Sequence, residues 1–156
     1  MKKLLLTVSL FLIFTSTVFA GVSEEDNCKN IINFRTVDIC VDSKANSLAA
    51  YQIDIRYDKE KIKVVGLEGG SDGFNNPPFY DRAGLEGGRI IIAAFIDDDA
   101  YAKNGKTMVA RLHLQTKGCR PYEFKTKLMA AARPGGKEIP VDIEVSFIDG
   151  QDVNDR

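Results

Sequence analysis

The sequence has no tryptophan, a single histidine and three cysteines among its 156 residues. It has no Cys-x-x-Cys pair, so a zinc site is not expected. It also has no Gly-x-Ser-x-Gly nucleophile motif and no glycine-rich phosphate loop ahead of a helix. The single histidine, His113, falls on the expected solvent side of a strand, and the sequence shows no obvious acidic and nucleophilic partners for it. We therefore expect no catalytic residues, no metal, no cofactor and no enzymatic activity.

The chain also has no excess of positive charge, with 21 lysines and arginines against 22 acidic residues. The formal net charge of −1 falls to about −3 when Lys2 and Lys3 are removed with the N-terminal segment, which holds no acidic residue. Such a balance provides neither the basic footprint of a nucleic-acid-binding protein nor a polybasic membrane patch. Acidic residues are plentiful but fall mostly at outward strand positions and turns, unlike the paired carboxylates of a glycosidase cleft. We expect no nucleic-acid partner.

The N-terminus has the pattern of a secretory signal peptide. Two lysines precede an apolar run over residues 4–14, and Val18 and Ala20 stand where a signal peptidase cleaves. The run is too short to be expected as a membrane-spanning helix. The alternative to a cleaved signal peptide is an uncleaved anchor. We expect residues 1–20 to be removed, leaving a secreted protein, extracellular or periplasmic, without membrane contact.

Export makes disulfides possible, and the number of cysteines is odd. Cys28, Cys40 and Cys119 allow three single pairings, each of which leaves one thiol over, or an intermolecular bridge through the odd cysteine. The sequence does not choose between these arrangements.

The body of the chain alternates apolar and polar residues with a period of two, the pattern of half-buried strands. Outward positions on one such strand are Gln52, Asp54 and Arg56. The run GRIIIAAFI, residues 88–96, is apolar from Ile90 onward, as expected for a strand covered on both faces or lying against a partner. About seven such strands, joined by glycine and proline turns, predict an antiparallel β-sandwich or jelly roll. The expected inward positions are Val37, Ile39, Val41, Tyr51, Ile53, Ile55, Tyr57, Met108, Ala110, Leu112 and Leu114.

Three segments, in this order, resemble the cohesin domain of cellulosome scaffold proteins. They are YQIDIRYDKEKIKVVGLEGG, GRIIIAAFIDDDAYAKNGKTMVARLHLQTKG and KEIPVDIEVSFIDG. The resemblance covers residues 34–150, preceded by a lead-in over 21–33 and followed by a tail over 151–156. It implies an all-β antiparallel sandwich of about nine strands with jelly-roll topology, which binds the dockerin module of another exported protein and has no catalytic role.

The resemblance also implies which residues contact the partner. Cohesins bind through one sheet face and the acidic loop after the apolar strand, which correspond here to Ala50, Gln52 and Asp54 together with Asp97 and Asp98. Scaffold cohesins usually place Asn and Asp where this chain has Ala50 and Gln52.

Two further interpretations remain open. Carbohydrate-binding modules of the same superfamily, linked to polysaccharide degradation, stack sugars on exposed aromatic rings, and here Phe79 and Tyr80 are the residues in question. The second interpretation is that the chain is a structural subunit of a surface assembly. The three carboxylates at Asp97 to Asp99 could hold calcium only if the backbone loops to bring them together, so an exposed acidic loop or partner-binding rim is expected instead.

Overall fold

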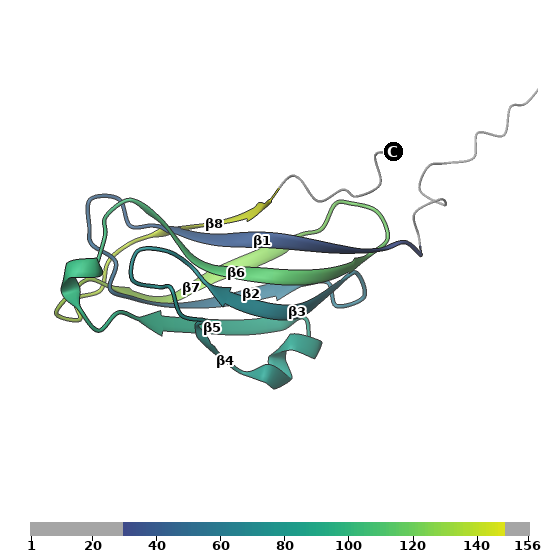
Figure 1. Ribbon diagram of the computed structural model, residues 1–156, viewed down its shortest axis with the longest axis horizontal. Coiled ribbons are helices and arrows are strands. Elements are labelled where there is room, and N and C mark those ends of the chain that lie inside the picture. The colour runs from purple at the N-terminus through teal and green to yellow at the C-terminus, as the bar shows by residue number, and fades with distance from the viewer. Residues whose placement is uncertain (1–29, 149–156) are drawn as a thin grey trace, which may run out of the picture.

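The structure is a sandwich of two antiparallel sheets, each with four strands (Figure 1). It is a computed structural model that describes residues 30–148. The first sheet has the order β3–β6–β1–β8 and the second β4–β5–β2–β7. The strands are β1 Ile32–Asp42, β2 Ala50–Tyr57, β3 Ile62–Gly69, β4 Phe79–Tyr80, β5 Arg89–Phe95, β6 Lys106–Lys117, β7 Phe124–Ala132 and β8 Asp142–Phe147.

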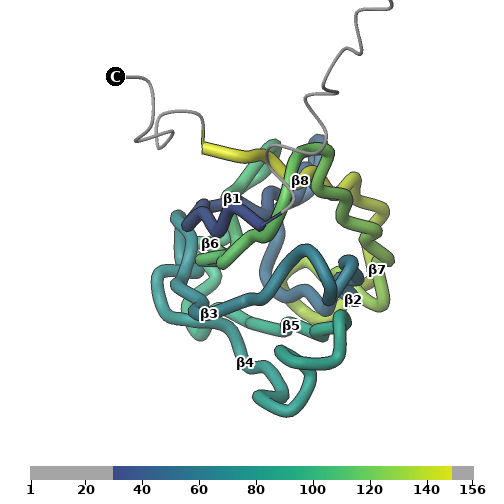
Figure 2. The backbone as a smooth tube through the Cα atoms, turned by 90° about the vertical axis from the view of Figure 1, so that its right-hand side faces the viewer, coloured from purple at the N-terminus to yellow at the C-terminus, as the bar shows by residue number. Residues whose placement is uncertain are grey.

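Two short 3₁₀ turns complete the described chain, η1 at Arg82–Glu86 and η2 at Asp99–Tyr101. Figure 2, turned by 90° from Figure 1, shows β4 and the following turn at one edge of the molecule. Neither turn within residues 30–148 is long or apolar enough to cross a membrane. The all-β antiparallel sandwich with jelly-roll topology that the sequence predicts is confirmed, with eight strands in the described residues.

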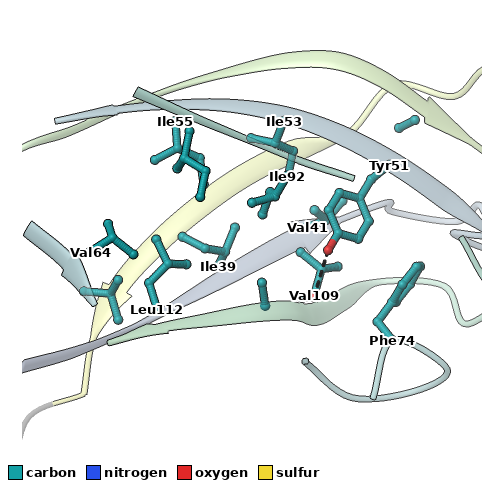
Figure 3. Packing of buried hydrophobic residues seen from close by; sticks show 14 of the residues in the cluster. Ile39, Val41, Tyr51, Ile53, Ile55, Val64, Phe74, Ile92, Val109 and Leu112 are labelled. Atoms are coloured by element: carbon teal, nitrogen blue, oxygen red, sulfur yellow. Dashed lines mark hydrogen bonds between the residues drawn. The ribbon is translucent and has the colours of Figure 1, made fainter. Parts of the chain in front are cut away.

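The core lies between the sheets and contains the predicted inward positions except Met108, together with further residues such as Ile92 and Val109. Ile39 and Val41 face Ile53 and Ile92 across the sandwich (Figure 3), and all four are fully buried. Tyr51 is also buried, and its hydroxyl donates a hydrogen bond of 3.0 Å to the carbonyl oxygen of Val109 in the opposite sheet. The alternation of apolar and polar residues with a period of two therefore predicts correctly which of these side chains are buried.

One inward prediction, at Met108, is wrong because β6 contains a bulge. Ile39 pairs with Ala110, whereas the next residue, Cys40, pairs with Met108, so Val109 is an extra residue on the β6 side. An extra residue reverses the alternation beyond it. Val109 is fully buried in place of Met108, which is only partly buried.

The cysteines that the structure describes are in different states. Cys119 is disulfide-bonded and Cys40 is a free thiol. Partial burial raises the pKa of the Cys40 thiol, an effect that outweighs the opposite influence of Lys106. Cys28 lies outside the described residues.

The expected signal peptide at 1–20 and the tail at 151–156 also lie outside the described residues. Strand β1 begins at Ile32, two residues before the expected start of the domain.

Candidate functional site

The outer face of the sheet β4–β5–β2–β7 has an apolar half and a basic half. Antiparallel pairing places residues in rows across the strands, with their side chains on one face. In the apolar half, Ala50 pairs with Phe95 and Ala132, and Gln52 pairs with Ala93 and Ala130. Phe79 on the edge strand pairs with Ala93 and extends this second row.

The apolar half forms a shallow trough of about 260 Å³. Its wall is made by two aromatic residues, Phe79 and Phe95, which are 71% and 61% exposed. The two rings stack with their centroids 6.3 Å apart and an angle of 12° between their planes. Gln52 is the only side chain in the lining that carries a hydrogen-bonding group on the outer face. The remaining lining residues are Ala50, Tyr51, Ala93, Ala94, Ala130, Ala131 and Ala132.

The basic half follows directly along the strands. Arg56 pairs with Arg89 and Lys125 in one row, and Asp54 pairs with Ile91 and Lys127 in the other. The two arginines converge on Asp54, with Nη2 to Oδ2 distances of 3.0 Å for Arg89 and 3.3 Å for Arg56. Arg89 adds a second bond through Nε, 3.1 Å from Oδ2.

Asp54 lies on the predicted outward face, yet its side chain is only 3% exposed because the two arginines cover it. Hydrogen bonds from Arg89, and then from Arg56, hold the pKa of the Asp54 carboxyl below its usual range. The guanidinium groups themselves are more than half exposed, so water screens the pair from the outside. One carboxylate thus partly neutralises two cations.

The two lysines in the basic half are exposed, and neither has a carboxylate within ion-pair distance among residues 30–148. Two carboxylates, Asp58 and Glu123, lie at the rim beyond the last row and line a hollow with Arg56, Tyr57 and Lys125. Asp58 is engaged in its own turn, where it accepts a hydrogen bond of 3.0 Å from the backbone N–H of Glu60. The face therefore retains an excess of positive charge over the rows that contain Arg56 and Asp54.

The acidic loop follows β5, beyond the apolar half. Asp98 accepts a hydrogen bond of 2.9 Å from the backbone N–H of Ala100 and so caps the η2 turn. Asp97 and Asp98 line a separate hollow together with Asn75, Asn76 and Tyr101. Within residues 30–148, no three His, Cys, Asp or Glu side chains are grouped in a way that could hold a metal ion.

The structure brings some of the sequence-predicted residues together and separates others. Ala50 and Gln52 lie in the trough, Asp54 lies beneath the arginines, and Asp97 and Asp98 lie past the end of β5.

The two aromatics considered for sugar binding point to opposite sides of β4. Phe79 faces the trough, whereas Tyr80 is partly buried and packs against the core. They do not form one platform. Phe95, which the sequence analysis did not select, is the ring that stacks on Phe79.

The opposite outer face, on the sheet β3–β6–β1–β8, differs in that several of its polar and charged side chains contact each other across strands. Arg111 lies 2.7 Å from Asp38, Lys106 lies 2.8 Å from Glu144, and Nε2 of His113 lies 2.9 Å from Glu68. Phe34 is an exposed ring at the end of this face. The ion pairs of Arg111 and Lys106 leave fewer charges on this face available to a partner.

Comparison with known proteins identifies the fold. No protein-family model matches the sequence, and no curated protein matches it. Among solved structures, a type I cohesin–dockerin complex from Clostridium thermocellum is similar at 15% identity with a TM-score of 0.56, over 72% of this chain and 90% of the other.

Two further cohesin structures are similar in the same way. One is a non-cellulosomal cohesin from the archaeon Archaeoglobus fulgidus, at 14% identity and a TM-score of 0.51, over 69% of this chain and 73% of the other. The other is a type I cohesin from Pseudobacteroides cellulosolvens, at 11% identity and a TM-score of 0.53, over 69% of this chain and 74% of the other. The chain therefore has the fold of cohesin domains.

Proposed function

We propose that this chain is a secreted, non-catalytic module that binds another exported protein through the outer face of β4–β5–β2–β7. The observation that carries the proposal is the alanine-floored trough beside two exposed, stacked phenylalanine rings. Exposed aromatic side chains in a concave apolar site are typical anchors of protein interfaces. One of the similar structures is a cohesin–dockerin complex, which supports a dockerin-bearing protein as the kind of partner.

The rigidity of the face also supports a docking role. Ala50, Gln52 and Asp54 are held on β2, a central strand with partners on both sides. A surface built on paired strands loses little conformational entropy on binding, so more of the contact energy is expressed as affinity. The acidic loop with Asp97 and Asp98 lies at the end of β5, where it could extend the contact.

A polysaccharide ligand is the second interpretation, and the exposed Phe79 and Phe95 rings are the observation in its favour. Sugars need hydrogen-bonding groups beside the stacking ring as well as the ring itself. The trough offers Gln52 alone among its outward side chains, so a protein partner fits its chemistry better.

Site-specific photocrosslinking tests this proposal. A photoreactive residue replaces Gln52 in the trough or, as the matched control, Gln115 on the outer side of β6 in the other sheet. The chain from Gly21 to Arg156 is then irradiated with the producing cell's exported proteins, and the adducts are identified by mass spectrometry. We expect a defined protein adduct at position 52 and none at position 115.

A blocking variant makes the result specific. Ala93→Arg places a long side chain over the floor of the trough, and Gln115→Arg adds the same charge to the other sheet. The adduct at position 52 should disappear with the first variant and persist with the second. Retention on insoluble polysaccharide without any protein adduct, or an adduct that Ala93→Arg leaves unchanged, would overturn the proposal.

A further inference from the structure

The dimensions of the face match a single α-helix laid along β2. Neighbouring strands lie about 4.8 Å apart, so the three strands β5, β2 and β7 span about 10 Å across. An α-helix with its side chains is about 10 to 12 Å wide. From Ala50 to Arg56 the strand rises about 20 Å, the length of about 13 helical residues.

The floor of the trough determines the size of the side chains that it can accept. Ala50, Ala93, Ala130 and Ala132 leave room above the sheet, and the Phe79 and Phe95 rings close one side. Large apolar side chains such as leucine or methionine would fill this volume, whereas small ones would leave it empty. The trough thus selects bulky apolar residues on the partner.

The adjoining rows determine the charge of the partner. Arg56, Arg89, Lys125 and Lys127 bring four cations to this half, and Asp54 is the one carboxylate within the rows. From the middle of the trough, between Ala50 and Gln52, to the middle of the basic rows, between Asp54 and Arg56, the distance along β2 is about 13 Å, which corresponds to about nine helical residues. Complementary charge at that spacing would steer association and fix the direction in which the helix lies.

We propose that the partner presents an amphipathic helix whose bulky apolar side chains fill the trough and whose carboxylates, about nine residues further along, lie over the basic rows. This inference rests on the proposed docking function and adds the chemistry and the direction of the partner segment. The basic rows bind the acidic end of the helix, and a helix with basic residues at that end binds more weakly because of charge repulsion.

Three synthetic helical peptides test the inference directly. They share one apolar face of leucines and differ only at three positions about nine residues beyond it, which are glutamate, glutamine or lysine. Binding to the chain from Gly21 to Arg156 is measured by fluorescence anisotropy at low and high salt. We expect the glutamate peptide to bind about five- to tenfold more tightly than the glutamine peptide, with the lysine peptide weakest and the difference smaller at high salt.

Variants separate the charge from the trough. Lys125→Ala together with Lys127→Ala should bring the glutamate peptide to the affinity of the glutamine peptide, and Lys63→Ala on the exposed side of β3 serves as the matched control. Neither lysine contacts Asp54 in an ion pair, so the fold should be preserved. Ala93→Arg should weaken all three peptides alike.

The outcomes distinguish this inference from the docking function. Equal affinity of the three peptides, or preference for lysine, overturns the charge assignment, while a native adduct at position 52 would still support docking. Failure of every peptide to bind likewise overturns the helix assignment alone. If polygalacturonate binds with dependence on Phe79 and Lys127 and the glutamate peptide does not, the basic rows serve an acidic polysaccharide and the inference is wrong.

Discussion

Removing the hydroxyl of Tyr51 should destabilise the sandwich, because this group forms the hydrogen bond that connects β2 to the bulge of β6. The hydroxyl donates to the carbonyl oxygen of Val109 over 3.0 Å, between two buried residues. The substitution Tyr51→Phe keeps the ring and its edge-on contact with Phe74, whose centroid lies 5.2 Å away. The hydrogen bond is therefore the main interaction that the variant loses.

The expected loss follows from the burial of the acceptor. A typical intramolecular hydrogen bond contributes about 0.5 to 1.5 kcal/mol, and leaving a buried acceptor without a partner costs about 1 to 3 kcal/mol. We expect Tyr51→Phe to lower the free energy of unfolding by about 1 to 2 kcal/mol. Urea denaturation followed by circular dichroism measures the change, with the slope of the transition unchanged if both states keep their compactness.

A second tyrosine on the same strand provides the control. The hydroxyl of Tyr57 donates to the carbonyl oxygen of Leu85 over 2.8 Å, but this bond is only partly buried, so water can replace the donor. Tyr57→Phe should therefore cost less than Tyr51→Phe. Equal losses for the two variants, or no loss for Tyr51→Phe, would refute the reasoning from burial.

The same hydroxyl predicts a dependence on alkaline pH. Burial raises the pKa of Tyr51 above its ordinary value of 10.0. A pKa that is raised on folding stabilises the protein below the unfolded value, and this contribution is lost as the pH rises toward the folded value. Wild type should lose stability above about pH 10 more steeply than Tyr51→Phe.

Asp54→Asn should reduce stability at pH 7 by about 1 kcal/mol, because it removes a carboxylate that accepts hydrogen bonds from Arg89 and Arg56. The carboxyl pKa is lowered on folding from its ordinary value of 3.8, so the contribution is present above that value and is lost as the pH falls through the folded pKa. Thermal melts should show the stabilities of wild type and variant converging in acid. Gly70→Ala should be strongly destabilising, since a Cβ there would lie 1.9 Å from the Met108 carbonyl oxygen, whereas Gly87→Ala, with its nearest contact at 3.6 Å, should be tolerated. Similar melting temperatures for Gly70→Ala and Gly87→Ala would contradict the prediction that Gly70, unlike Gly87, lacks room for a Cβ atom.

The sequence predicts the sandwich well because a period of two determines the buried face of a strand from local residues alone. Ile53 and Ile55 are buried as predicted. The prediction fails at Met108, because the bulge at Val109 is determined by the pairing with β1, and nothing in the alternation itself reveals an extra residue. The two-residue strand β4 is similarly too short to leave a periodic signal.

The candidate site was predictable only in part. Ala50 and Gln52 were selected through the resemblance, but Ala93, Ala130 and Ala132 come from strands far apart in the sequence and meet only through register. The runs AAF on β5 and MAAA on β7, in which small residues replace large ones on an outer face, were the available signal. The covering of Asp54 could not be predicted, because Arg89 is 35 positions away.

The position of β1 at the centre of its sheet has a consequence for how the chain folds. This strand lies between β6 and β8, and its Asp38 pairs with Arg111, 73 positions later. Closing such long loops costs conformational entropy before the contacts between the strands contribute favourable energy. Sandwiches of this kind therefore fold over milliseconds to seconds. Strand β1 is synthesised before its partners β6 and β8, so it stays unpaired until they are available. During that interval its apolar residues, including Val37, are exposed to solvent and can aggregate.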